Sequence, residues 1–181
     1  MLGQYDEKAF LASAVAPSAA RPIGAPGVYA ILLAAPDALP GVAVGREGVL
    51  YLGMTGATLE ARNHFRHAHS GFSTFRRSLG AILASDLGLS AIPRGPGASK
   101  SNVQNYRFPD EGERALTAWM ERHLLIAQMA LPGDLARIEK DLIASLEPPL
   151  NLTGWPNPQR AALKALRAAC AAQARSSRIG N

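Results

Sequence analysis

The sequence has a single cysteine, few aromatic residues and no long apolar run. Aromatic residues make up 6% of its 181 residues, and Cys170 is the one cysteine. One cysteine excludes an intramolecular disulfide, and no Cys/His cluster has the spacing of zinc ligands. No segment approaches the ~18 consecutive apolar residues of a membrane-spanning helix. We therefore expect a soluble, cytoplasmic protein without a membrane partner.

Acidic side chains are missing from two long stretches. Residues 61–85 and 148–181 contain no Asp or Glu, although they hold nine of the 19 basic residues. Those basic residues are Arg62, Arg66, Arg76, Arg77, Arg160, Lys164, Arg167, Arg175 and Arg178. Together with the formal net charge of +5, this distribution favours a polyanionic partner such as a nucleic acid. A solvated basic surface that aids solubility is the alternative, and charge alone does not separate the two.

Two short runs predict a β-hairpin with a long loop. Residues 27–34 and 48–54 are rich in β-branched or aromatic side chains and are bounded by Gly and Pro, which is typical of strands. Side chains alternate between the two faces of a strand, so Tyr29 shares a face with Ile31, and Tyr51 shares one with Gly53. We expect both phenols on one side of the sheet if the strand register permits.

The remaining sequence predicts helices and one more strand. Ser73 or Thr74 can cap a helix, and so can Asp134. The expected helices cover residues 5–15, 59–68, 74–83, 112–123, 135–146 and 158–174, and 88–101 is a flexible loop. The third strand covers 124–131, where the purely apolar composition is also compatible with a helix. These elements define an α+β fold with a small three-stranded, mainly antiparallel sheet flanked by helices.

One carboxylate is expected to point inward. In the predicted helix 135–146, Glu139 falls inside the apolar stripe formed by Leu135, Ile138, Leu142 and Leu146. Burying an ionised carboxylate without a partner costs several kcal/mol, about 3 or more, so Glu139 should be paired, protonated or bound to a cation. A salt bridge to a core-edge arginine is the structural explanation, and a bound Mg²⁺ is the functional one.

Five elements in order resemble the GIY-YIG nuclease superfamily. They are Gly27-Val28-Tyr29, Tyr51-Leu52-Gly53, Arg62, Glu139 and Asn151. Each tripeptide alone is a weak signal, whereas the ordered set is strong. The resemblance covers residues 26–155 and implies three regions: a lead-in segment 1–25, a nuclease domain 26–155, and a C-terminal helix with a basic tail 156–181. The loops 34–47 and 87–105 are longer than the family's usual connections.

The resemblance also implies an activity and a cofactor. It implies a metal-dependent endonuclease that hydrolyses DNA, with Mg²⁺ or Mn²⁺ held by Glu139 and no small-molecule cofactor. Tyr51 would act as general base, Tyr29 would orient the water or phosphate, and Arg62 would hold the phosphate. A tyrosine has an ordinary pKa near ~10, so nearby positive charge must lower it before it can serve as base. The alternatives are a non-catalytic nucleic-acid-binding module and an RNA-directed or toxin-like nuclease.

The catalytic histidine is ambiguous. The family commonly has a histidine four residues after the arginine, but Arg66 occupies that position here. His64 and His67 compete for the role; on a helix, His67 lies about 140° away from Arg62. We favour His64, because strain at the start of the helix can redirect it, and surface histidines without a catalytic role are the alternative.

The remaining candidates are substrate contacts. They are Arg66, His67, Arg76, Arg77 and Asn151. Arg76 and Arg77 follow a capped helix start, where phosphate contacts are common, and an exposed basic edge is the alternative. For Asn151, bracing of the site by hydrogen bonds is the stronger expectation.

Overall fold

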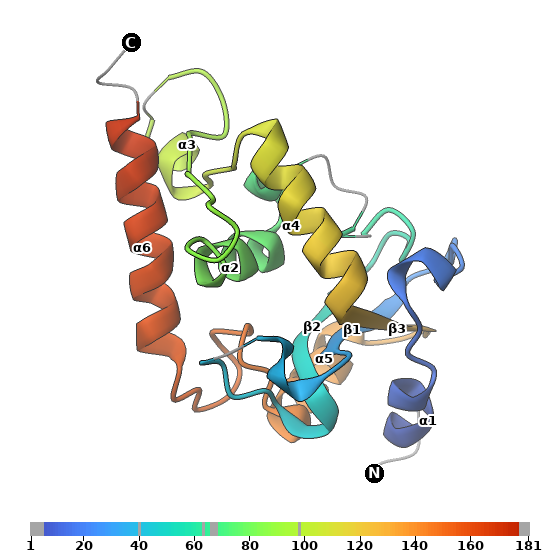
Figure 1. Ribbon diagram of the computed structural model, residues 1–181. Coiled ribbons are helices and arrows are strands. Elements are labelled where there is room, and N and C mark those ends of the chain that lie inside the picture. The colour runs from blue at the N-terminus through green and yellow to red at the C-terminus, as the bar shows by residue number, and fades with distance from the viewer. Residues whose placement is uncertain (1–5, 40, 63, 66–68, 98, 178–181) are drawn as a thin grey trace. The chain divides into compact units, whose positions relative to one another are not determined.

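A computed structural model describes residues 6–39, 41–62, 64–65, 69–97 and 99–177. Figure 1 shows the chain with its helices and strands labelled. The chain forms two compact units: residues 1–63 with 121–159, and residues 64–120 with 160–181. None of the helices within the described residues is both long enough and apolar enough to cross a membrane.

The first unit is built on the predicted antiparallel sheet. Its strands are β1 (Gly27–Leu33), β2 (Val49–Thr55) and β3 (Leu124–Ala130). The order is β2-β1-β3, with β1 in the centre and both neighbours antiparallel to it. Every residue of β1 is buried, as its apolar, β-branched and aromatic composition predicts. The expected α+β class with a small three-stranded sheet is confirmed.

Helices α5 (Leu135–Leu146) and α1 (Glu7–Ala12) complete the core of this unit. The apolar stripe of α5 packs with one face of the sheet. The cluster comprises Phe10, Leu11, Val28, Ala30, Leu32, Val49, Leu52, Ala127, Leu135, Ile138, Leu142, Ile143 and Leu146. As predicted, the Asp134 side chain accepts a hydrogen bond from the Arg137 N–H (3.1 Å) and caps α5. This packing fixes α5 against β2 and so positions Glu139.

Three 3₁₀ turns connect these elements: η1 (Pro17–Ala19), η2 (Pro36–Ala38) and η3 (Arg46–Gly48). The long loop between β1 and β2 contains η2 and η3. It ends where Glu47 (φ 55°) and Gly48 (φ 77°) adopt the left-handed conformation, which turns the chain into β2.

The second unit is helical. It contains η4 (Ser70–Phe72), α2 (Thr74–Ile82), α3 (Lys100–Gln104), α6 (Arg160–Ser176) and most of α4 (Asp110–His123). Helix α6 lies beside α2 and α3 (Figure 1). The large apolar side chains Phe75, Tyr106 and Phe108 are each 0% exposed and form the centre of this unit.

The helix predicted over residues 59–68 is wrong in its described part, where residues 59–62 and 64–65 form turns. The N–H of Leu59 donates to the Ala25 carbonyl (3.0 Å), and the N–H of Glu60 donates to the Ile23 carbonyl (3.1 Å). These contacts, made with residues far away in sequence, hold the segment in an irregular conformation despite its helical pattern. Residues 66–68 lie outside the described residues.

The loop expected over residues 88–101 is more structured than predicted. Ile92 pairs with Arg107 in an isolated antiparallel bridge. Helix α3 begins at Lys100, and the Ser99 hydroxyl caps it by accepting from the Asn102 N–H (3.2 Å). The glycines and prolines therefore correctly indicated irregular backbone here, but this backbone still forms hydrogen bonds within its own unit.

Candidate active site

The two tyrosines of the hairpin lie together on one face of the sheet. The register pairs Tyr29 with Gly53 and Tyr51 with Ile31, which places both phenols on the same side. Their ring centroids are 6.2 Å apart, with an interplanar angle of 38°. The predicted shared face is therefore confirmed, and it is opposite to the face that packs with α5.

The motif glycines make room for this arrangement. A Cβ at Gly53 would overlap the Tyr29 phenol, and a Cβ at Gly27 would overlap the Met129 carbonyl of β3. The Tyr29 ring therefore packs over Gly53 of β2, where any larger residue would clash with it. The sequence pattern flagged these glycines only as part of a motif, and the structure gives their physical reason.

Arg62 joins the tyrosine pair from the turn after β2. Its backbone N–H donates to the Leu59 carbonyl (3.2 Å), and its side chain is exposed. The guanidinium hydrogen-bonds to the Tyr29 hydroxyl, and the Tyr29 hydroxyl hydrogen-bonds to Tyr51. An arginine, which cannot accept a hydrogen bond, is the donor in the first contact. The result is a short polar chain that runs from an exposed cation to the two phenols.

Glu139 of α5 acts electrostatically on both phenols. Its side chain is half-buried, and burial raises the pKa of its carboxyl group. Hydrogen bonding from the Met54 backbone and the positive charge of Arg62 lower the pKa again, without offsetting burial. Glu139 in turn raises the pKa of Tyr51 through its negative charge, so the carboxylate and the phenol are electrostatic neighbours.

Both phenols have raised pKa values. For Tyr29 the main cause is burial, with the neighbouring Tyr51 second, while Arg62 opposes both. For Tyr51, burial and then Glu139 raise the pKa, and Arg62 and the hydrogen bond from Tyr29 lower it. Arg62 thus acts in the direction that a tyrosine base requires, but burial outweighs it. At neutral pH both hydroxyl groups are protonated.

The donor set at this place suits a hard divalent cation. Among the described residues, no group of three or more His, Cys, Asp or Glu side chains could hold a metal ion. Mg²⁺, however, needs only one or two protein carboxylates when waters and a substrate phosphate complete its shell. Glu139 offers an oxygen ligand, and a cation beside it would offset the charge that burial disfavours. The residues therefore fit Mg²⁺ or Mn²⁺.

Asn151 braces the outer edge of β2. Its Oδ1 accepts from the Leu52 N–H (2.8 Å), and its Nδ2 donates to the Leu52 carbonyl (2.9 Å). The Leu150 N–H donates to the Leu50 carbonyl (3.0 Å) beside it. The amide thus replaces a missing neighbouring strand. Its Oδ1 and Nδ2 both have protein partners, which supports the bracing role, while a substrate contact by Asn151 stays a prediction.

His64 lies in the second unit and is 3% exposed. Its Nδ1 is 2.8 Å from the Ser73 hydroxyl, and its ring centroid is 5.7 Å from that of Phe75. A ring buried in this way is not open to a substrate from solvent, which argues against the catalytic role expected for His64. The competing His67 lies outside the described residues, as does Arg66.

Arg76 and Arg77 are interior braces. The Arg76 side chain is 0% exposed and its Nη2 lies 2.8 Å from the Glu113 carboxylate. The Arg77 Nη1 donates to the carbonyls of Ser70 and Gly71, both at 3.0 Å. Their burial corrects the expected phosphate contacts and also the alternative of an exposed basic edge.

The sequence-based predictions did not include Glu113, the carboxylate that forms the ion pair with Arg76. Glu113 is 4% exposed and accepts from the Ser70 N–H (2.7 Å), the Ser70 hydroxyl (2.9 Å) and the Phe108 N–H (3.0 Å). A signal was present, because Glu113 lies in phase with the buried residues Leu116 and Met120 of α4. The same inward placement drew attention to Glu139.

A family model for the GIY-YIG catalytic domain matches residues 42–169. The matched range contains Tyr51, Arg62, Glu139 and Asn151, while Tyr29 precedes it. It covers well over half of the chain and extends into α6, and the sequence-based limits of 26 and 155 stay a prediction. No curated protein and no solved structure matches the chain.

Proposed function

The chain belongs to the GIY-YIG catalytic domain family, and from this premise we propose that it is an endonuclease that hydrolyses DNA phosphodiester bonds. Membership implies a nuclease-type function, and hence a hydrolase. The DNA substrate, the divalent cation and the roles of single residues are our proposal. We also propose that Glu139 is the residue that holds the cation.

One observation carries the proposal: four chemically complementary side chains from separate elements influence one another within one compact unit. Tyr29 comes from β1, Tyr51 from β2, Arg62 from the turn after β2 and Glu139 from α5. The electrostatic effects of Arg62 and Glu139 on the two phenols tie all four together. An accidental surface cluster would not need Gly53 to leave space for the Tyr29 ring.

In the proposed reaction, a water oxygen attacks phosphorus in line and the bond to the departing 3′ oxygen breaks. Tyr51, after losing its own proton to solvent, accepts the proton of the attacking water, and a solvent proton completes the departing hydroxyl group. Tyr29 hydrogen-bonds to Tyr51 and holds the phenol in place. The products are a 5′-phosphate and a 3′-hydroxyl.

Arg62 is the proposed phosphate-binding residue. Its side chain is exposed, and its guanidinium also contacts Tyr29. A guanidinium presents several N–H donors in a fixed fork, which matches the oxygens of a phosphate. In this position it offsets the negative charge that develops on the phosphate oxygens during attack. Removal of one such donor from an active site typically slows the reaction by about 10²–10³-fold.

Tyr51 needs more positive charge than Arg62 supplies, because burial and Glu139 both raise its pKa. A divalent cation held by Glu139 would neutralise the carboxylate beside Tyr51 and stabilise the departing oxygen as a Lewis acid. The chain's own contribution is to hold Glu139 half-buried on α5, next to the edge of β2.

The test is nicking of supercoiled plasmid with Mg²⁺, with and without EDTA, by the wild type and by Glu139→Ala. The matched control is Asp141→Asn, which removes an exposed carboxylate from the same helix. We expect nicking by the wild type and the control, and loss of nicking in Glu139→Ala and in EDTA. Metal-independent nicking, or full activity of Glu139→Ala, would overturn the proposal.

A binding module without catalysis is the second candidate, and the burial of His64 favours it. In that case the wild type would retain plasmid DNA but leave it uncut with Mg²⁺, Mn²⁺ and other divalent ions. A matched RNA substrate in the same assay tests the remaining alternative. Cleavage of RNA in preference to DNA would replace the DNA substrate in the proposal and keep the nuclease chemistry.

A further inference from the structure

One large aromatic side chain of the second unit remains outside its core. Phe72 of η4 is 67% exposed, against 39% for Val15 and 41% for Leu166, the other large hydrophobic residues exposed in the described part of the chain. The neighbouring Phe75 and Phe108 are each 0% exposed. The unit thus buries the two phenylalanines that follow Phe72 and leaves this ring in solvent.

Phe72 belongs to a small aromatic and cationic cluster. The His69 ring centroid lies 4.9 Å from that of Phe72, and the Arg94 guanidinium carbon lies 5.3 Å from the Phe72 centroid. A Cβ at Gly71 would lie 2.6 Å from the Arg94 Cγ and 2.9 Å from the His69 Nδ1. The absence of a side chain at Gly71 therefore lets these two residues approach.

Three arginines act electrostatically on His69. After burial, Arg107 is the largest influence that lowers the pKa of His69, and Arg76 and Arg94 act in the same direction. The effect of Glu113 is opposite. The lowered pKa leaves the His69 ring neutral at pH 7, so it packs as an aromatic ring, while the positive charge near Phe72 belongs to Arg94.

We propose that Phe72, with Arg94 and His69, forms a stacking platform for an unpaired nucleobase of the nucleic-acid substrate. This inference rests on the proposed function, because it names the class of substrate: a strand with an unpaired segment. An exposed aromatic face stacks on any nucleobase, and an adjacent arginine adds cation–π attraction and a phosphate contact. An isolated exposed apolar residue needs no such explanation, but His69 and Arg94, which both contact Phe72, supply the rest of a base-binding surface.

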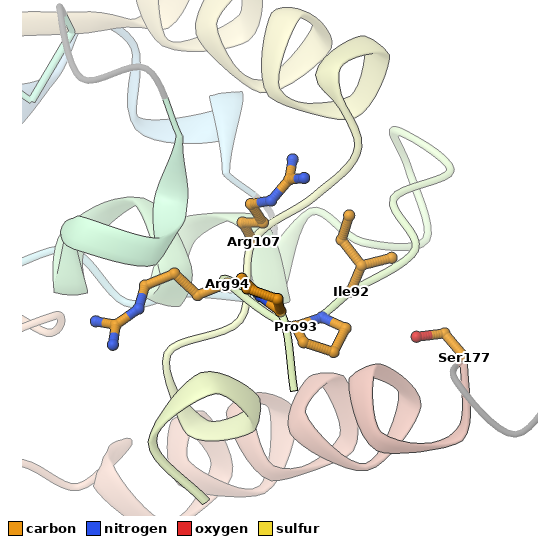
Figure 2. A pocket seen from close by; sticks show the side chains of 7 residues that line it. Ile92, Pro93, Arg94, Arg107 and Ser177 are labelled. Atoms are coloured by element: carbon orange, nitrogen blue, oxygen red, sulfur yellow. The ribbon is translucent and has the colours of Figure 1, made fainter. Parts of the chain in front are cut away.

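A nearby cavity is a weaker candidate for this role. It has a volume of about 420 Å³ and is lined by Ile92, Pro93, Arg94, Gly95, Pro96, Arg107 and Ser177. In Figure 2 the side chains of Arg94 and Arg107 extend in different directions, so they do not converge on one anion. Arg107 also lies 3.5 Å from Asp110 and donates to the Phe108 carbonyl. The cavity therefore lacks a cationic pair directed at one ligand.

The test measures binding in EDTA, where the proposed cleavage does not occur. The probes are a labelled oligothymidylate of about 15 nucleotides, a uridine oligonucleotide of the same length and a blunt duplex. We expect Phe72→Ala to weaken binding of the single strands about tenfold or more and to change duplex binding little. Phe72→Trp should bind like the wild type. The control is Leu166→Ala, an exposed apolar residue of the same unit, which should change neither.

Phe72→Leu separates base stacking from a general apolar contact. Leucine keeps an apolar side chain but has no aromatic face, so this variant should bind single strands as weakly as Phe72→Ala. Unchanged single-strand binding by Phe72→Ala, or wild-type binding by Phe72→Leu, would overturn the platform. Equal losses for single strands and duplex would also overturn it, because they indicate a contact that does not read unpaired bases.

The outcome can be separated from that of the nuclease proposal. Phe72-dependent binding of single strands by a chain that cuts no nucleic acid would keep the platform and overturn the nuclease. If the protein cleaves nucleic acid but its binding of single strands does not depend on Phe72, the platform is overturned and the nuclease proposal stands. Comparison of the thymidine and uridine probes shows whether the platform prefers DNA or RNA.

Discussion

Two inward-placed carboxylates, Glu113 in the second unit and Glu139 in the first, differ in their partners. Glu113 in the second unit meets the Arg76 guanidinium, two backbone N–H groups and a serine hydroxyl, with little exposure. Glu139 in the first unit stays half-buried, and Arg62 and the Met54 backbone do not offset the effect of burial on its pKa. An inward carboxylate is therefore not in itself a sign of function. A carboxylate surrounded by protein donors stabilises the fold, and one that remains accessible and undercompensated can take a cation.

The largest expected effect is a loss of catalysis when the proposed active site around Glu139 is altered. Tyr51→Phe keeps the ring and removes the proposed base, so we expect a loss of plasmid nicking of about 10²–10⁴-fold. DNA binding should stay close to that of the wild type. Nicking rates under single-turnover conditions, with binding measured in EDTA, check this. Nicking by Tyr51→Phe at the wild-type rate would exclude Tyr51 as the base.

Removal of the Glu113 carboxylate should instead lower the stability of the fold. Glu113→Ala leaves the Arg76 charge buried without its partner, and such breaks cost about 3–5 kcal/mol. Glu139→Ala should change the free energy of unfolding by less than about 1 kcal/mol, because it removes a charge that burial already disfavours. Urea unfolding of both variants measures this. If Glu139→Ala proves the more destabilising of the two, the distinction drawn between them is wrong.

A smaller effect should come from the glycine beneath Tyr29. Gly53→Ala introduces a Cβ into the space of the Tyr29 phenol, and overpacking of this kind costs about 1–3 kcal/mol. Because the displaced ring holds Tyr51, nicking should fall even under conditions where the variant is fully folded. Gly56→Ala is the matched control, since a Cβ there meets no atom within 4 Å. Equal nicking and equal stability of the two variants would show that the space left by Gly53 for the Tyr29 ring is unimportant.

The smallest expected effect is on the pH dependence of cleavage. Burial and Glu139 raise the pKa of Tyr51, and the proposed base is its deprotonated form. The rate should therefore keep rising from pH 7 to about 9, whereas a histidine base of ordinary pKa would give a plateau above about pH 7. Rates measured with saturating Mg²⁺ test this. A plateau near neutral pH would favour a histidine, including His67, over Tyr51.

The sequence predicted those features of the fold that depend on residues close together in the chain. Strand alternation placed Tyr29 and Tyr51 on one face, and the register confirms it. The helical stripe of α5 identified Glu139 as an unusual residue, because a carboxylate among apolar positions is visible in a periodic pattern. Capping residues likewise located the start of α5.

The errors arose where contacts between distant residues decide the outcome. Residues 59–65 have a helical pattern, but Leu59 and Glu60 bond to the backbone of residues 23–25 and form turns. The burial of Arg76 depends on Glu113, which is 37 residues away in the sequence. A charge pattern shows that an arginine is present but not which carboxylate it contacts, so Arg76 and Arg77 were wrongly predicted as surface residues.

A comparison of the two carboxylates in one assay tests directly whether Glu139, and not Glu113, holds the catalytic cation. Glu139→Gln and Glu113→Gln are each matched in folded protein concentration, and plasmid nicking is followed as a function of Mg²⁺ concentration. We expect Glu139→Gln to be folded and inactive at every Mg²⁺ concentration, while the folded fraction of Glu113→Gln nicks with the wild-type dependence on Mg²⁺. Wild-type nicking by Glu139→Gln would contradict this expectation.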